Sequence, residues 1–133
     1  MQERTITTGR EAIFLAGIFG FLSVALGAFG AHGLKDHLSS QMMAIYHTGV
    51  EYQMTHTLAL FTVGLLQRMD QRANRLLIWS GRLFAIGIVF FSGSLYILAV
   101  SGVKLLGAIT PLGGVAFLAG WSLLAIWGYS ERR

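Results

Sequence analysis

The sequence contains no cysteine, and only one of its 133 residues is proline. The lack of cysteine excludes a disulfide framework, a thiolate metal site and a redox-active thiol. Charged residues are also scarce, because they make up 12% of the chain, about half the share that soluble globular domains carry. So few charges could not cover a surface that faces water. The composition therefore indicates a membrane protein.

Glycine and long apolar runs are what the chain has in quantity. Its 17 glycines are typical of transmembrane helices, which use glycine to bring backbones close together. The length predicts one domain, residues 1–133. The net charge of +4 suggests nucleic-acid binding at first sight. However, the basic residues lie outside the apolar runs, as in membrane proteins that keep positive charge on one side, so we expect no nucleic-acid partner.

Four apolar segments predict an all-α membrane protein, a four-helix transmembrane bundle with spans at about residues 12–31, 50–66, 76–100 and 110–129. The first is an uncharged run of about 20 residues, which is enough to cross a hydrocarbon core of roughly 30 Å and too long for a signal peptide. An amphipathic extension from Ser40 to His47 precedes the second. The fourth has two possible starts: Thr110–Pro111 is typical of a helix N-terminus, whereas a kinked helix would begin at Leu105.

The distribution of positive charge predicts the orientation of the bundle. Seven of the ten Lys and Arg residues flank the termini or the loop between the second and third spans: Arg4, Arg10, Arg68, Arg72, Arg75, Arg132 and Arg133. The other side has only Lys35 and Lys104, because Arg82 falls within the third span. Positive charge is retained on the cytoplasmic side, so we expect both termini in the cytoplasm.

Small residues predict where helices approach closely. Along the first span they form one stripe at spacings of three and four: Ala12, Ala16, Gly20, Ser23, Gly27 and Ala31. The fourth span has a shorter stripe: Gly113, Ala116 and Gly120. Helix backbones can pack closely along such stripes. We therefore expect the first and fourth spans, or two copies of the first span, to be neighbours. The tryptophans are expected to anchor at the lipid headgroups.

Polar residues of several spans converge at one depth when about 1.5 Å of helical rise is counted per residue. This predicted outer polar layer comprises His32, His47, Glu51, Tyr52, Gln53, His56, Ser92, Ser94, Tyr96 and Thr110. His47 and Glu51 are one helical turn apart, so they can meet on one helix face, as can Tyr52 and His56. Arg82 is a predicted buried charge that lies some 13 Å from Glu51 along the membrane normal, too far for an ion pair.

The polar layer admits three interpretations. Because a charged carboxylate is costly inside a membrane, Glu51 is expected to be paired, hydrogen-bonded or protonated. It could stabilise the bundle as an acceptor, or act with His56 in passing protons or binding a small polar substrate. In a third interpretation the histidines bind haem or a metal, but di-iron bundles need several inward carboxylates, and this chain has one. Ser23, Ser92 and Ser94 lack the surroundings of a nucleophilic serine, so no enzyme activity is expected.

Four motifs resemble a known family. They are residues 27–34 (GAFGAHGL), Tyr52–Gln53 followed by His56, residues 91–96 (FSGSLY), and residues 110–114 (TPLGG) leading to Gly120–Trp121. Together they resemble the domain-of-unknown-function 423 family over nearly the whole chain. That family includes transmembrane protein 256 of animals and many small bacterial inner-membrane proteins. The resemblance implies a four-span protein of the bacterial inner membrane, and it brings no reaction, substrate or cofactor.

The leading functional hypothesis is an accessory or assembly subunit that packs against a larger membrane complex or against itself. It follows from the small-residue faces, the near lack of extramembrane parts and the incomplete catalytic sets. A proton-linked transporter or channel that uses Glu51 and His56 is the alternative, and a haem or metal protein is the third hypothesis. No cofactor is expected, and the lipid bilayer is the one certain partner.

Overall fold

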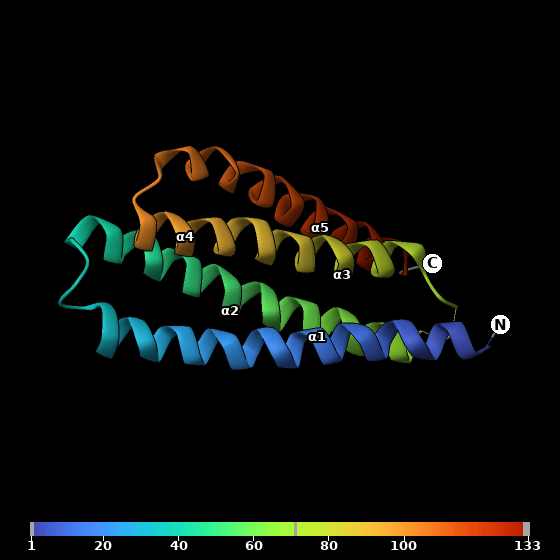
Figure 1. Ribbon diagram of the computed structural model, residues 1–133. Helices are drawn as coiled ribbons and strands as arrows, with labels where there is room; N and C mark the ends of the chain where they lie inside the picture. The colour runs from blue at the N-terminus through green and yellow to red at the C-terminus, as the bar shows by residue number, and fades with distance from the viewer. Residues whose placement is uncertain (1, 71, 132–133) are drawn as a thin grey trace.

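The computed structural model describes residues 2–70 and 72–131, with side chains from Gly9 onward. Of the seven basic residues expected on one side, Arg132 and Arg133 lie outside the described residues, as does the side chain of Arg4. The described chain is all-helical, and its four long helices run alternately up and down, so that both termini lie at the same end (Figure 1).

The helices follow one another with short connections. In chain order the elements are α1 (Gln2–Phe29), the π-helical turn η1 (Gly30–Leu34), α2 (Ser40–Met69), α3 (Arg75–Gly87), the π-helical turn η2 (Ile88–Ser92), α4 (Gly93–Ser101), the 3₁₀ turn η3 (Lys104–Ala108) and α5 (Thr110–Ser130). The third long helix consists of α3, η2 and α4 without a break. The fourth long helix is α5, which begins at Thr110. A separate 3₁₀ turn, η3, precedes it at Lys104–Ala108.

Local sequence explains where the helices begin and end. The side chain of Ser39 accepts a hydrogen bond from the backbone N–H of Met42 at 3.2 Å and so caps α2. Asn74 caps α3 in the same way, through Leu76. Gly102 ends α4 in the left-handed conformation, at a φ of 72°, which glycine adopts without strain. Proline stands in the first turn of α5, where its missing N–H costs nothing.

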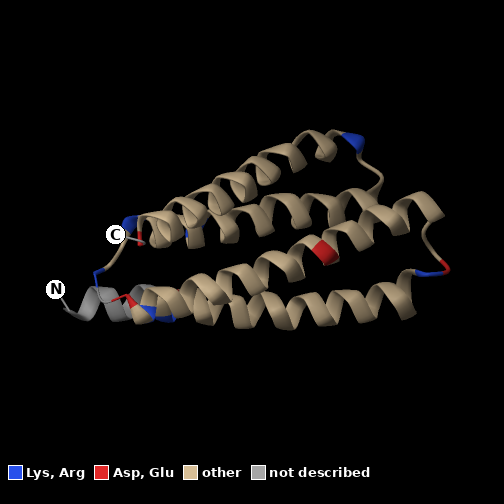
Figure 2. Ribbon diagram, turned by 180° about the vertical axis from the view of Figure 1, so that it is seen from behind, with Lys and Arg blue, Asp and Glu red and all other residues tan. Residues whose placement is uncertain are grey.

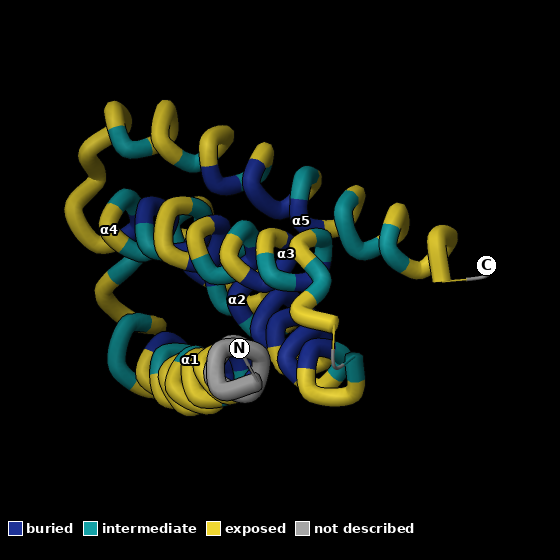
Figure 3. The backbone as a smooth tube through the Cα atoms, turned by 90° about the vertical axis from the view of Figure 1, so that its right-hand side faces the viewer, coloured by how far each residue is buried: buried dark blue, intermediate teal, exposed yellow. Residues whose placement is uncertain are grey.

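Long helices that follow one another in the sequence also pack against one another in the bundle. α1 packs mainly against α2, while α5 packs against α3 and η2, and α2 also contacts α3 and α4. Much of α1 is exposed at the surface of the bundle, whereas buried residues line the facing sides of α2 and α3 (Figure 3). The expectation that the first and fourth spans would be close neighbours is therefore wrong, because each small-residue stripe packs against a different helix.

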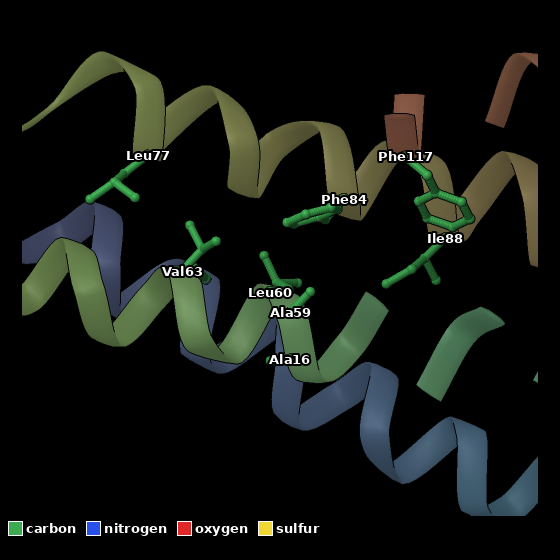
Figure 4. Packing of buried hydrophobic residues seen from close by; sticks show 9 residues of the cluster. Ala16, Ala59, Leu60, Val63, Leu77, Phe84, Ile88 and Phe117 are labelled. Atoms are coloured by element: carbon green, nitrogen blue, oxygen red, sulfur yellow. The ribbon is translucent and has the colours of Figure 1, made fainter. Parts of the chain in front are cut away.

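The core lies between α2 and α3. Leu60, Val63, Leu77 and Phe84 are almost completely buried, and Phe117 of α5 closes one side of the cluster (Figure 4). Ala16 brings α1 into the same cluster. Because lipid is as apolar as leucine, the benefit of this packing in a membrane comes from van der Waals contact rather than from the exclusion of water.

Glycines differ sharply in how closely a neighbour approaches them. A Cβ added at Gly113 would lie 2.4 Å from the backbone nitrogen of Phe91, so α5 and η2 touch backbone to backbone there. At Gly20 and Gly27 of α1 the nearest α2 atoms would lie at 3.6 Å and 3.5 Å, which is ordinary contact. Gly113 therefore packs more closely than Gly20 and Gly27 of the α1 stripe. Outside the stripe, α1 also approaches α2 closely at Gly9, where an added Cβ would lie 2.9 Å from the backbone oxygen of Gly64.

Within the described part of the chain, three helical segments are long and apolar enough to cross a membrane: Gly9–Leu34, Arg75–Ser101 and Lys104–Ser130. The helix α2 has a similar length of 30 residues. It is less apolar because polar side chains recur along it, among them Glu51, Gln53 and His56.

Candidate functional site

The structure divides the predicted outer polar layer into two groups. Six of its members are buried or partly buried between helices: Gln53, His56, Ser92, Ser94, Tyr96 and Thr110. The other four lie exposed at the surface of the bundle: His32, His47, Glu51 and Tyr52. The predicted layer is therefore only partly buried. Tyr52 contacts neighbouring helices despite its exposure, because the centroid of its ring lies 4.5 Å from that of Phe91 and 6.2 Å from that of Phe117.

His56 links α2 to α5. Its Nδ1 lies 2.7 Å from the backbone oxygen of Tyr52, and the indole N–H of Trp121 donates to its Nε2 at 3.0 Å. A carbonyl oxygen can only accept and an indole N–H can only donate, so Nδ1 carries the proton and Nε2 is bare. The ring of Phe117 stacks on the imidazole at a centroid distance of 3.5 Å. Both ring nitrogens of His56 are therefore occupied.

Gln53 joins three helices. Its Nε2 donates to the backbone oxygen of Phe19 in α1 at 2.9 Å, and its Oε1 accepts a hydrogen bond from the hydroxyl of Tyr96 in α4. The side chain is 3% exposed. One amide thus holds α1 and α4 to opposite sides of α2.

Buried hydroxyls make the remaining connections. Ser92 donates to the oxygen of Gly49 at 2.7 Å, which ties η2 to α2, and Ser80 donates to Gly120 at 2.8 Å, which ties α3 to α5. The hydroxyls of Ser94 and Thr110 lie 2.7 Å apart between α4 and the start of α5. We call the residues of these contacts, together with Gln53, His56, Tyr96, Trp121 and the Tyr46 hydroxyl that donates to Leu26, the interhelical polar network.

The network is chemically saturated rather than poised for reaction. Four of its side chains donate to backbone oxygens of another helix, namely those of Gln53, Tyr46, Ser80 and Ser92, which suits a bundle whose helices must hold together in lipid. His56 would have to lose a hydrogen bond before it could bind a metal or haem iron, or accept a proton. Within residues 9–70 and 72–131, no group of three His, Asp or Glu side chains has the geometry of a metal site.

The sequence analysis missed three members of this network. Tyr46 and Ser80 were not singled out, although both are almost completely buried. Trp121 was expected at the headgroups, but it lies well inside α5 and bonds to His56. The signal for Trp121 was present in its position, because eleven residues of α5 precede it and nine follow it. Tyr46 and Ser80 carried no such signal, because their partners are backbone atoms.

Two residues of the exposed group, His47 and Glu51, belong to a longer, mostly polar stripe along α2. His47, Glu51, Thr55, Leu58 and Thr62 recur at spacings of four and three residues, and all five are exposed. We call them the α2 polar stripe. Glu51 lies within α2. Figure 2 shows one acidic residue part-way along a long helix, while most other charged residues lie near the ends of the bundle. Glu51 is exposed, and no hydrogen bond or ion pair joins its side chain to another of the described residues. The expectation that it is paired, hydrogen-bonded or protonated stays a prediction.

Arg82 is also exposed and not buried as expected. Its guanidinium lies over the ring of Trp79 at 5.0 Å from the centroid. Trp79 is nearly one turn closer to the end of the bundle that holds the termini, so the arginine extends toward that end. This is how a basic side chain near a membrane boundary keeps its charge close to the headgroups.

The fold, the apolar helices and the polar contacts between them define a small helical integral membrane protein. The family model described as "Protein of unknown function (DUF423)" matches residues 26–114, and the chain belongs to this family. It is 47% identical over 126 residues to the inner membrane protein YgdD of Escherichia coli K12, covering 95% of each chain.

A second relative, the membrane protein YwdK of Bacillus subtilis, is 46% identical over 114 residues, which cover 86% of this chain and 92% of the relative. Both relatives carry the family label UPF0382. No solved structure matches the chain. Because these relatives are named as membrane proteins, one of them of the inner membrane, the chain is placed in the inner membrane.

Proposed function

We propose that the protein is a non-catalytic subunit that docks through the α2 polar stripe onto another protein of the same membrane. In this proposal all four long helices, α2 included, cross the membrane, and both termini face the cytoplasm. The saturated interhelical polar network supports an architectural role, because its side chains hold helices together and leave no reactive group unoccupied.

The exposure of Glu51 carries the proposal. A carboxylate that faces lipid from within a span is costly by about 2.5–3.5 kcal/mol on insertion scales, and nothing in the described chain satisfies it. A partner that covers this face with a hydrogen-bond donor would remove that cost. The neighbouring Thr55 and Thr62 add small polar groups of the kind found where transmembrane helices associate.

The chemistry of the stripe favours a different protein over a second copy of this chain. Two copies inserted in the same orientation would pair their α2 helices in parallel, around an axis along the membrane normal. Residues at the same depth would then face each other, Glu51 against Glu51 and His47 against His47. Like charges at close range are unfavourable, so the fitting partner is a helix that presents a basic residue or a hydroxyl at the depth of Glu51.

Site-specific crosslinking tests this proposal cleanly because the chain has no cysteine of its own. A benzophenone attached at Thr55→Cys is expected to form an adduct with one other membrane protein, and Glu51→Leu in the same chain should abolish it. Val115→Cys on the exposed face of α5 is the matched control. Adducts formed only between copies of this chain, or equally well from Val115→Cys, would contradict the proposal.

A further inference from the structure

A half-enclosed groove of about 250 Å³ lies between α1, α2 and α3. Its apolar walls are formed by Ala12 and Leu15 of α1, Leu60 of α2, and Ala85 and Ile86 of α3. Leu15 and Ile86 are exposed, so this side of the groove opens onto the surface that faces lipid. The width and apolar lining suit a hydrocarbon chain.

The groove becomes polar toward the end of the bundle that holds the termini. Glu11 of α1, Gln67 of α2 and Arg82 of α3 line it there. The three side chains come from three different helices and present a carboxylate, an amide and a guanidinium. An apolar groove with an acid, an amide and a base at one end has the polarity of a phospholipid.

Gln67, at the polar end of the groove, has a buried hydrogen-bond acceptor that lacks a donor. The residue is 7% exposed, and its Nε2 donates to the backbone oxygen of Leu77 at 3.0 Å. Its Oε1 is buried and has no hydrogen-bond partner. Turning the amide over would not help, because two acceptor oxygens would then face each other. A buried acceptor without a donor is costly, so a ligand that brings a donor to Oε1 would be stabilised.

We propose that the groove binds a phospholipid whose headgroup carries a primary ammonium. One acyl chain lies along the apolar walls, the phosphate pairs with Arg82, and the ammonium donates to Oε1 of Gln67 and to the carboxylate of Glu11. Guanidinium groups suit phosphate oxygens, and an ammonium has three donors to share between two acceptors. Glu11 and Arg82 thus match the two opposite charges of one zwitterionic headgroup.

Glycerol and choline headgroups match the polar end of the groove less well than an ethanolamine headgroup does. A glycerol headgroup has hydroxyl donors for Gln67, but its lipid is a net anion and has no positive charge to offer Glu11. A choline headgroup is positive but its methylated nitrogen has no N–H to donate. The charges at the groove therefore distinguish three common lipid classes that share the same phosphate and acyl chains.

The test is native mass spectrometry of the full chain with an equimolar mixture of phosphatidylethanolamine, phosphatidylglycerol and phosphatidylcholine of identical acyl chains. We expect ethanolamine lipid adducts to exceed each of the others by about tenfold, the effect of one charge-assisted hydrogen bond. Glu11→Gln should reduce this preference to about threefold or less, since a neutral hydrogen bond is roughly half as strong. Arg82→Gln should weaken binding of all three lipids.

Glu131→Gln and Arg75→Gln are the matched controls, because both residues are exposed near the same end of the bundle but do not line the groove. Each should leave the lipid preference unchanged. Equal binding of the three lipids by the wild-type chain, a preference for phosphatidylglycerol, or an ethanolamine preference that Glu11→Gln leaves undiminished would overturn the proposal. Helical circular dichroism of each variant separates loss of binding from loss of fold, and a Glu11→Gln variant that keeps its helices but binds as wild type also counts against it.

Discussion

The indole N–H of Trp121 donates to Nε2 of His56 at 3.0 Å and thereby fixes which nitrogen of the imidazole carries its proton. The two residues are 65 positions apart in the sequence. The contact joins α5 to α2 at a partly buried position, next to the ring of Phe117 that stacks on the imidazole. A histidine that looked like a candidate ligand or proton carrier thus forms a connection between two helices.

Removing this hydrogen bond should destabilise the bundle. Trp121→Phe keeps most of the aromatic packing but leaves Nε2 of His56 without a donor, so we expect a loss of about 1–2 kcal/mol in the free energy of unfolding. Unfolding in mixed detergent micelles, followed by circular dichroism, measures it. Trp79→Phe is the control, since that indole donates no hydrogen bond among the described residues. Equal losses in the two variants would show that the bond contributes nothing.

Two buried serines should respond in opposite ways to the same substitution. Ser92 donates to Gly49 across helices, so Ser92→Ala should lower the free energy of unfolding by about 0.5–1.5 kcal/mol. The hydroxyl of Ser23 is buried without a partner, so Ser23→Ala should be neutral or stabilising by up to about 1 kcal/mol. Both serines are 1% exposed, which makes them a matched pair. A Ser23→Ala variant that loses more unfolding free energy than Ser92→Ala would contradict these hydrogen-bond assignments.

Glycine positions on α5 and α1 should differ in their tolerance of alanine. Gly113→Ala would drive a Cβ into the backbone of Phe91, so we expect a loss of about 1–3 kcal/mol in unfolding free energy. Gly17→Ala meets nothing within 4 Å and should be neutral or slightly stabilising, because alanine is the better helix former. The same micelle unfolding experiment compares them. A tolerant Gly113 would mean that α5 and η2 are not in backbone contact.

Two substitutions of Glu51 should differ in their effect on association with the proposed partner. If a partner donates a hydrogen bond to Glu51, then Glu51→Gln keeps an acceptor and should preserve association with that partner. Glu51→Leu removes the acceptor and should reduce association by about tenfold, while the isolated bundle unfolds no more easily than wild type. Co-purification quantifies the first effect and micelle unfolding the second. Reduced stability of the isolated Leu variant would instead assign Glu51 a role within the chain.

Much of the helical layout could be predicted because long apolar runs and capping residues act locally. For α5 the sequence left two starts open, Thr110 and Leu105, and in the structure the α-helix begins at Thr110 with the proline in its first turn. The gathering of Gln53, Ser92 and Tyr96 also followed from counting helical rise.

Which helices would be neighbours could not be read from the same pattern. A stripe of small residues indicates that another helix packs closely there, but it does not identify that helix. The stripes of α1 and α5 looked alike in sequence. In the structure, Gly113 touches the backbone of η2, while Gly20 makes ordinary contact with α2. Depth along a helix is likewise encoded in sequence position, but the direction that Glu51 faces depends on how α2 rotates against its neighbours.

The proposed docking through the α2 polar stripe is tested most directly by the native mass and composition of the protein, after gentle extraction from its own membrane through a tag on the C-terminus. We expect recovery in a fixed ratio with one different membrane protein, and loss of that protein in Glu51→Leu but not in Glu51→Gln. Recovery as a lone monomer, or as an assembly of identical copies that Glu51→Leu leaves intact, would contradict it.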